Sequence, residues 1–156
     1  MKKIIERNNL FEEIEEIKKQ KKKIVFTNGC FDILHLGHAE YLLESSKFAD
    51  VLIVGLNSDT SVKKLKGDSR PINNESDRAK LLLHLACVDY VVIFNEDTPV
   101  NLLEIIKPDV YTKGADYTID TLPEAQVVLK NGGRVEFINL VEGKSTTNVI
   151  KKIEQK

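Results

Sequence analysis

The sequence predicts an α/β protein with a doubly wound, five-stranded parallel sheet and helices on both faces. Short apolar runs alternate along the chain with longer segments whose apolar residues recur at helical spacing. Parallel strands need crossover connections, which are almost always right-handed and usually helical. Strands that are separated by helices therefore indicate a sheet that is covered on both sides.

The elements follow in order. A helix is expected first, because Leu10, Ile14 and Ile17 repeat at helical spacing between an acidic beginning and a lysine-rich end. We treat residues 1–22 as this helix with its connector and residues 23–156 as the main unit of one domain. Strands are expected at 23–27, 51–56, 90–94, 109–112 and 134–138. Helices are expected at 38–48, 77–87, 99–106 and 122–131, with a final helical stretch around Val149 and Ile153.

Ligands of such sheets bind beyond the carboxyl ends of the strands. The loops at 27–37, 56–77, 95–99 and 113–121 should therefore line the site.

Composition limits the possible partners. The 156 residues carry 23 basic and 24 acidic side chains, a net charge of −1, so the bulk charge favours neither a nucleic acid nor a membrane surface. Two cysteines give no disulfide framework. The chain shows neither a signal-peptide pattern nor an apolar run of eighteen residues, and we expect a cytoplasmic protein.

The most informative segment is T-N-G-C-F-D-I-L-H-L-G-H at 27–38, which follows the first main strand and opens a helix. Gly37 between His35 and His38 lets the backbone approach a phosphate closely, and the helix start offers free N–H groups to an anion. Either histidine alone would be better explained as a helix cap or a core residue. Zinc is disfavoured, because neither cysteine stands at ligand spacing and no H-E-x-x-H pattern occurs, so no metal ligands are assigned.

The pattern G-x-F-D-x-L-H-x-G-H resembles the signature of the cytidylyltransferase-like nucleotidyltransferases, whose fold is the Rossmann-like sheet predicted above. The resemblance implies that His35 and His38 contact a nucleoside triphosphate and stabilise its α-phosphate during attack. It also implies that Phe31 and Asp32 shape the turn. The nucleotide contacts expected from this segment are Asn28, Gly29, Cys30, Phe31 and Gly37.

A second feature is E-G-K-S-T-T at 142–147, just before the final helical stretch. One hydroxyl would suffice for an N-cap. Ser145, Thr146 and Thr147 at a helix start also suit phosphate binding, and the family uses this element on the triphosphate tail. Lys144 stands where the family often has isoleucine, which places a positive charge beside the phosphates.

The segment 57–73 is basic, long and irregular, and most of its lysines are expected to be solvated. Arg70 and Arg78 are assigned to substrate, because guanidinium groups suit phosphate recognition. By resemblance to the family's mobile-loop lysine, Lys63 is the expected catalytic lysine, with Lys64 and Lys66 as alternatives.

Three stretches, K-G-D-S-R-P-I-N, K-G-A-D-Y at 113–117 and E-G-K-S-T-T, closely resemble adenylyltransferases that act on D-glycero-β-D-manno-heptose 1-phosphate, across nearly all of residues 23–154. The resemblance implies transfer of AMP from ATP to give ADP-heptose and pyrophosphate for surface glycans such as lipopolysaccharide. Lys113 and Gly114 would contact nucleotide, and Asp116 and Asp32 substrate. It also implies Mg²⁺ with ATP, a homodimer, and a sugar kinase that many relatives carry fused and that we expect here as a separate protein.

Other functions remain open. A cytidylyltransferase for glycerol 3-phosphate or another phosphorylated alcohol would keep the chemistry, and a nucleotide sensor would keep the phosphate contacts without catalysis. An aminoacyl-tRNA synthetase is disfavoured by length and by the absence of K-M-S-K-S, and a kinase by the absence of G-x-x-x-x-G-K-[ST].

Overall fold

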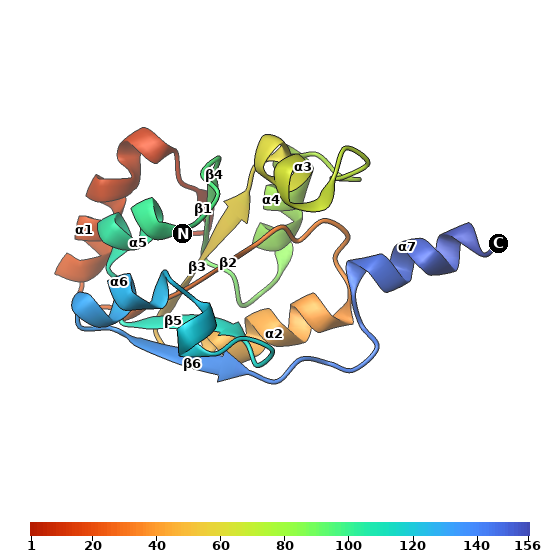
Figure 1. The fold of residues 1–156 in the computed structure, drawn as a ribbon. Coiled ribbons are helices and arrows are strands. Elements are labelled where there is room, and N and C mark those ends of the chain that lie inside the picture. Colours follow the sequence, from red (N-terminus) through yellow and green to blue (C-terminus); the bar gives the residue numbers. More distant parts are fainter.

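The computed structural model describes residues 1–156 and shows one parallel sheet of six strands in the order β1-β4-β3-β2-β5-β6 (Figure 1). Every neighbouring pair runs parallel. The strands are β1 (Lys3–Ile4), β2 (Ile24–Gly29), β3 (Val51–Asn57), β4 (Tyr90–Phe94), β5 (Val110–Gly114) and β6 (Arg134–Ile138). The α/β class and all five predicted strands are confirmed, and β1 is an addition.

Helices cover both faces of the sheet. On one face lie α1 (Leu10–Lys19), α5 (Val100–Ile106) and α6 (Ala125–Lys130), whose apolar residues form one core cluster with Phe26 and Tyr111. On the other lie α2 (Leu36–Ser46) and α4 (Glu75–His84), which pack Leu42 and Leu82 onto a second cluster. The doubly wound arrangement is therefore confirmed.

The N-terminal residues belong to the same core. Lys3 and Ile4 pair with Tyr90 and Val91, and Leu10 and Ile14 of α1 are almost fully buried. A two-residue strand carries no detectable periodicity, which explains why the sequence does not reveal β1. Residues 1–22 thus form an edge strand and a covering helix of the sheet.

The segment 57–73 was predicted to be irregular, but part of it forms a helix, α3 (Asp59–Lys66). Ser58 caps it by accepting the N–H of Ser61, and Val62 anchors it in the interior. The helix α3 has only eight residues and two aliphatic side chains, Val62 and Leu65, so its helical periodicity covers too few positions to be recognised in the sequence.

The last helix, α7 (Thr146–Glu154), projects from the body of the molecule (Figure 1). None of its residues is fully buried. The remaining regular turns are two short 3₁₀ helices at Arg7–Asn9 and Ile119–Thr121. None of the helices combines the length and apolar character needed to cross a bilayer.

Candidate active site

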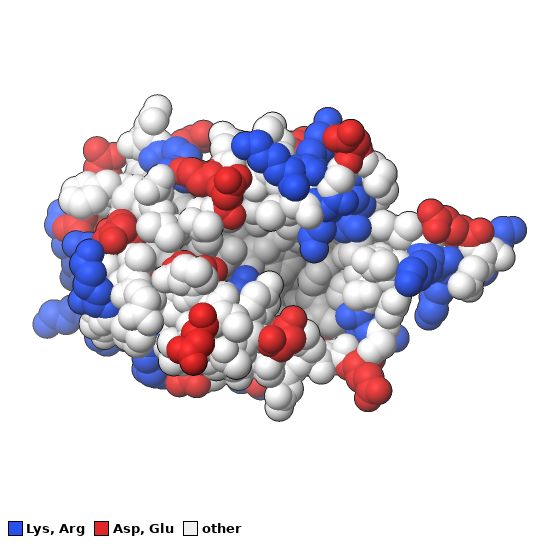
Figure 2. Space-filling model, in the orientation of Figure 1, with Lys and Arg blue, Asp and Glu red and all other residues white.

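A cavity of about 580 Å³ opens at the carboxyl ends of β2, β3 and β5. This volume lies within the range typical of small-molecule sites. Figure 2 shows it as a hollow near the centre of the face, with basic side chains gathered above it and acidic ones below. The cavity lies where ligands of doubly wound sheets bind.

The structure brings most of the predicted site residues to this cavity. Two of them, Lys63 and Arg78, do not line it. Those that do are Asn28, Gly29, Cys30, Phe31, Asp32, His35, Gly37, His38, Arg70, Lys113, Gly114, Asp116, Ser145, Thr146 and Thr147.

His35 and His38 stack against each other at the start of α2. Their ring centroids lie 3.8 Å apart with 25° between the planes, and Phe31 contacts His38 edge-on at 5.1 Å. A Cβ atom on Gly37 would approach the His35 ring to 2.8 Å, so a side chain here would displace the imidazole. The glycine between the histidines is therefore required by the stacking itself.

Burial lowers the pKa of both imidazoles, which favours their neutral form. Burial lowers the pKa of His38 to about 4, and the neighbouring His35 adds to the effect. Burial, with the charge of Lys144, also lowers the pKa of His35. The Nδ1 atoms of both rings are buried without a hydrogen-bond partner. Buried polar atoms are normally paired, so these two nitrogens are exceptions within the fold.

The start of α7 lies beside the histidines. Ser145 caps the helix by accepting the N–H of Asn148 at 3.0 Å, and the Thr146 hydroxyl donates to the carbonyl of Ile33 at 3.2 Å. The second bond fixes the α7 start to the loop that carries His35. Two helix starts, those of α2 and α7, therefore line one cavity, and each offers free backbone N–H groups.

Asp32 holds a neighbouring segment in place. Its carboxylate accepts from Arg70 Nε at 2.6 Å and from the backbone N–H groups of Ile72 and Asn73, both at 2.9 Å. Burial raises the pKa of Asp32, but these donors outweigh burial and bring it below its ordinary value. Asp32 is thus engaged within the protein, and it is Arg70, held by Asp32, that presents its remaining guanidinium nitrogens.

Arg78 has a structural role in place of the predicted substrate contact. It is fully buried, donates to the carbonyls of Cys30, Asn57 and Asn73, and pairs with Asp59 at 2.8 Å. These four partners join α4, α3 and the loop after β2. The guanidinium that appeared suited to phosphate instead satisfies backbone oxygens that would otherwise be buried unpaired.

The structure places a different lysine of α3 at the cavity from the one predicted. Lys66 at the end of α3 lines the cavity, whereas Lys63 lies one turn earlier outside it. Lys144 lines the opposite rim beside Gly37.

The floor of the cavity holds residues that the sequence did not reveal. The Tyr111 hydroxyl lies 2.6 Å from Asn28 Oδ1 and 3.3 Å from Glu124 Oε1. Burial, with the charge of Glu124, keeps the pKa of Tyr111 well above its ordinary value, so the phenol remains a donor. Glu124 lay inside a predicted helix without a local motif. Further lining residues not singled out beforehand include Tyr41, Asn57, Thr98, Pro99, Leu140 and Val141.

Nucleophilic and metal chemistry find little support in the side chains themselves. Burial raises the pKa of the Cys30 thiol, which disfavours the thiolate. No group of three or more histidine, cysteine, aspartate or glutamate side chains could hold a metal ion. The site offers N–H donors and cations, which suit phosphate groups.

Comparison with known proteins agrees with this geometry. Residues 26–152 match the model of the family described as cytidylyltransferase-like. The chain is 53% identical over 136 residues to the bifunctional protein HldE of Geobacter sulfurreducens, covering 87% of this chain and 28% of that protein. It is 57% identical over 145 residues to the protein of the same name from Campylobacter concisus, covering 92% and 30%. The chain thus spans less than a third of the length of these relatives.

Two solved structures share the fold. The lipopolysaccharide core biosynthesis protein of Thermoplasma volcanium superimposes with a TM-score of 0.62 at 31% identity, covering 79% of this chain and 99% of that one. Pantoate-beta-alanine ligase of Francisella tularensis, with β-γ ATP and β-alanine bound, gives a TM-score of 0.61 at 14% identity over 100% of this chain and 80% of that one, a likeness of fold alone. The family match extends from β2 into α7 and includes both histidines, so the chain belongs to the cytidylyltransferase-like family.

Proposed function

We propose that the protein is an adenylyltransferase that transfers AMP from ATP to D-glycero-β-D-manno-heptose 1-phosphate, giving ADP-heptose and pyrophosphate. The observation that carries the proposal is the stacked His35–His38 pair, whose Nδ1 atoms lack partners in a cavity lined by two helix starts. The sugar is suggested by the three motifs that resemble heptose 1-phosphate adenylyltransferases. The relatives named HldE and the lipopolysaccharide core biosynthesis protein support the same role.

The chemistry needs no protein nucleophile. A phosphate oxygen of the sugar attacks the α-phosphorus of ATP, a bond forms there, and the bond to the β-phosphate oxygen breaks to release pyrophosphate. Positioning two bound reactants can supply effective molarities of about 10⁵–10⁸ M. His35 and His38 would donate to the α-phosphate, while Lys66, Lys144 and the start of α7 neutralise the leaving pyrophosphate.

Mg²⁺ is proposed to enter with ATP. Magnesium usually keeps several waters and binds largely through substrate phosphates, which agrees with a cavity rich in cations and N–H donors. Asp32 is committed to Arg70, Ile72 and Asn73, so the phosphates would provide the inner ligands. When bound, the metal ion would offset the charge that develops on the phosphate oxygens.

The substrates also suggest the setting. ATP and sugar phosphates are cytoplasmic metabolites, and a separate sugar kinase is proposed to act upstream. We propose a cytoplasmic homodimer, as the family resemblance implies. Light scattering of the purified chain would measure the oligomeric state directly.

Pyrophosphate release tests the function. The heptose 1-phosphate and glycerol 3-phosphate are each offered with ATP, CTP, GTP or UTP in the presence of Mg²⁺. Release confined to ATP with the heptose phosphate is expected. Release with CTP and glycerol 3-phosphate would replace the substrates but keep the chemistry, and no release with any pair would favour a nucleotide sensor.

A further inference from the structure

One buried carboxylate in the cavity is not used by the phosphate chemistry. Glu124 precedes α6 and is only 8% exposed, yet it lines the cavity. It forms no ion pair, and its one hydrogen-bonding contact within the protein is with the Tyr111 hydroxyl at 3.3 Å. A buried carboxylate ordinarily accepts several hydrogen bonds, because burying an unpaired charge is costly. Glu124 therefore has acceptor capacity left over.

The Tyr111 contact satisfies Glu124 only weakly. A phenol carries a single proton, and Tyr111 Oη lies 2.6 Å from Asn28 Oδ1, much closer than to Glu124. The Tyr111 hydroxyl therefore donates its proton mainly to Asn28 Oδ1. Burial lowers the pKa of Lys113, and the nearby charge of Glu124 offsets part of this effect. The two side chains nevertheless form no ion pair. The free lone pairs of Glu124 lie where a bound molecule could donate to them.

The position of Glu124 separates it from the phosphate contacts. Phe26 and Asn28 are two residues apart on β2 and share a face, and Phe26 and Tyr111 pack in the cluster formed with α1, α5 and α6. The histidines and the start of α7 instead lie on the side of α2, whose apolar residues belong to the other cluster. The cavity therefore spans the sheet edge, with the helix starts of α2 and α7 on one side and Glu124, near Lys113, on the other.

This division fits the geometry of attack. In phosphoryl transfer the attacking and leaving oxygens lie roughly in line on opposite sides of the phosphorus. With the pyrophosphate held beside α2 and α7, the body of the acceptor extends toward α5 and α6, where Glu124 lies. A carboxylate there repels phosphate but accepts readily from hydroxyl groups.

We infer that Glu124 forms the subsite for the hydroxyl groups of the acceptor, and that it is a specificity-determining residue for a polyhydroxylated acceptor. The inference rests on the proposed function, whose acceptor is a sugar phosphate. Tyr111 is a positioning residue, because it touches both Asn28 and Glu124 from below and is itself fully buried. A simple phosphorylated alcohol lacks the extra hydroxyls that this subsite would bind.

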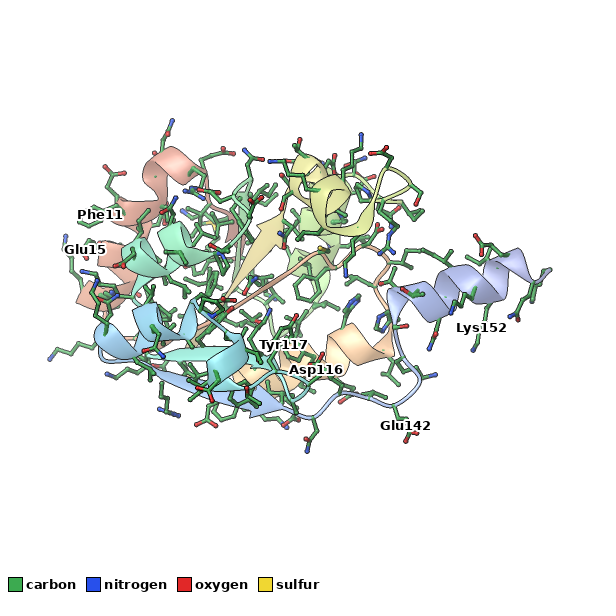
Figure 3. All side chains as sticks on the ribbon, in the orientation of Figure 1. Phe11, Glu15, Asp116, Tyr117, Glu142 and Lys152 are labelled. Carbon is green, nitrogen blue, oxygen red and sulfur yellow. The ribbon has the colours of Figure 1, made fainter.

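The test compares Glu124→Gln and Glu124→Asp with Glu15→Gln, a control at an exposed position of α1 that Figure 3 shows far from Asp116 and Tyr117 of the cavity. Glutamine keeps the reach but loses the charge, and aspartate keeps the charge but loses the reach. Both are expected to raise KM for the heptose 1-phosphate at least about 10-fold and leave KM for ATP within about 2-fold, while the control changes neither. Circular dichroism checks that each variant folds, and Tyr111→Phe, which leaves the carboxylate intact, should raise the acceptor KM by a smaller factor.

Calorimetric binding of the heptose 1-phosphate, with a non-hydrolysable ATP analogue present, separates this inference from the proposed function. The wild-type protein could bind the sugar phosphate without turning it over, while both Glu124 variants bind it more weakly. This result would contradict the proposed function and support the subsite. An equal rise in KM for ATP would assign Glu124 to the ribose and overturn the inference. Unchanged KM and affinity, or no binding of the sugar phosphate to wild type, would overturn it as well.

Discussion

The imidazole rings of His35 and His38 stack at 3.8 Å and leave both Nδ1 atoms buried without partners. Such an arrangement serves the fold poorly, because each unpaired buried nitrogen costs free energy. It is better explained by a ligand, because both histidines also line the cavity. The predictions that follow start from this pair.

Replacing His35 or His38 with alanine should lower kcat about 10²–10³-fold, the usual loss when one donor to a developing oxyanion is removed. The stability of the fold should fall little, because the Nδ1 atom of each ring has no hydrogen-bond partner within the protein. Pyrophosphate release and a melting curve measure the two effects. His84→Ala, at an exposed position of α4 outside the cavity, is the matched control. A variant of His35 or His38 with wild-type turnover would contradict the catalytic role of that histidine.

Stability should fall in acid because of His38. Its pKa is about 4 in the folded protein against about 6.5 in the unfolded chain, so between these values the unfolded chain binds more protons. Stability is therefore complete above about pH 6.5 and is lost as pH falls toward 4, by up to about 3 kcal/mol at about 1.4 kcal/mol per pKa unit. Urea unfolding at several pH values should show this slope, and His38→Gln should flatten it. An equal slope in the variant would mean that other groups cause the loss.

Asp32→Asn should destabilise the protein by about 3 kcal/mol, because the buried partner of Arg70 loses its charge. Burial leaves that carboxylate 1% exposed, and asparagine keeps its shape while placing an amide against the N–H groups of Ile72 or Asn73. Asp120→Asn, on the exposed 3₁₀ turn, should be neutral and provides the baseline. Chemical denaturation compares the three proteins, and an unchanged midpoint for the Asp32 variant would refute the anchoring role.

Ser145→Ala should lower the stability of the protein and raise KM for ATP. The lost N-cap of α7 costs about 1 kcal/mol, and the loosened helix start should raise KM for ATP. Asn74→Ala removes the equivalent cap of α4, whose asparagine does not line the cavity, so it should lower stability without changing KM. If both variants left KM unchanged, capping alone would account for Ser145.

The sequence was sufficient for features with a periodic or motif signal. The five apolar strands, the helices on both faces and the His35–His38 loop were all predicted from the residues, because burial on parallel strands and helix amphipathicity are local patterns. Glu124 was missed because its role depends on Tyr111 and Asn28, thirteen and ninety-six positions away in the chain. Arg78 was misassigned because its carbonyl partners come from three separate segments of the chain, and a backbone oxygen leaves no trace in the sequence.

The helix α3 decides which lysine meets the phosphates. In an irregular loop either Lys63 or Lys66 could reach the phosphates. In a helix, residues three apart lie nearly one turn from each other along the axis. The position of α3 is fixed at its start by the Ser58 cap and by the buried Val62. Lys66 then lines the cavity and Lys63 does not. Lys66→Ala should raise KM for ATP about 10-fold, the loss of one charged contact, whereas Lys63→Ala should stay within about 2-fold. Steady-state rates at varied ATP compare this matched pair. The reverse order would mean that α3 turns or unwinds when ATP binds, and the cavity-lining lysine would then be Lys63.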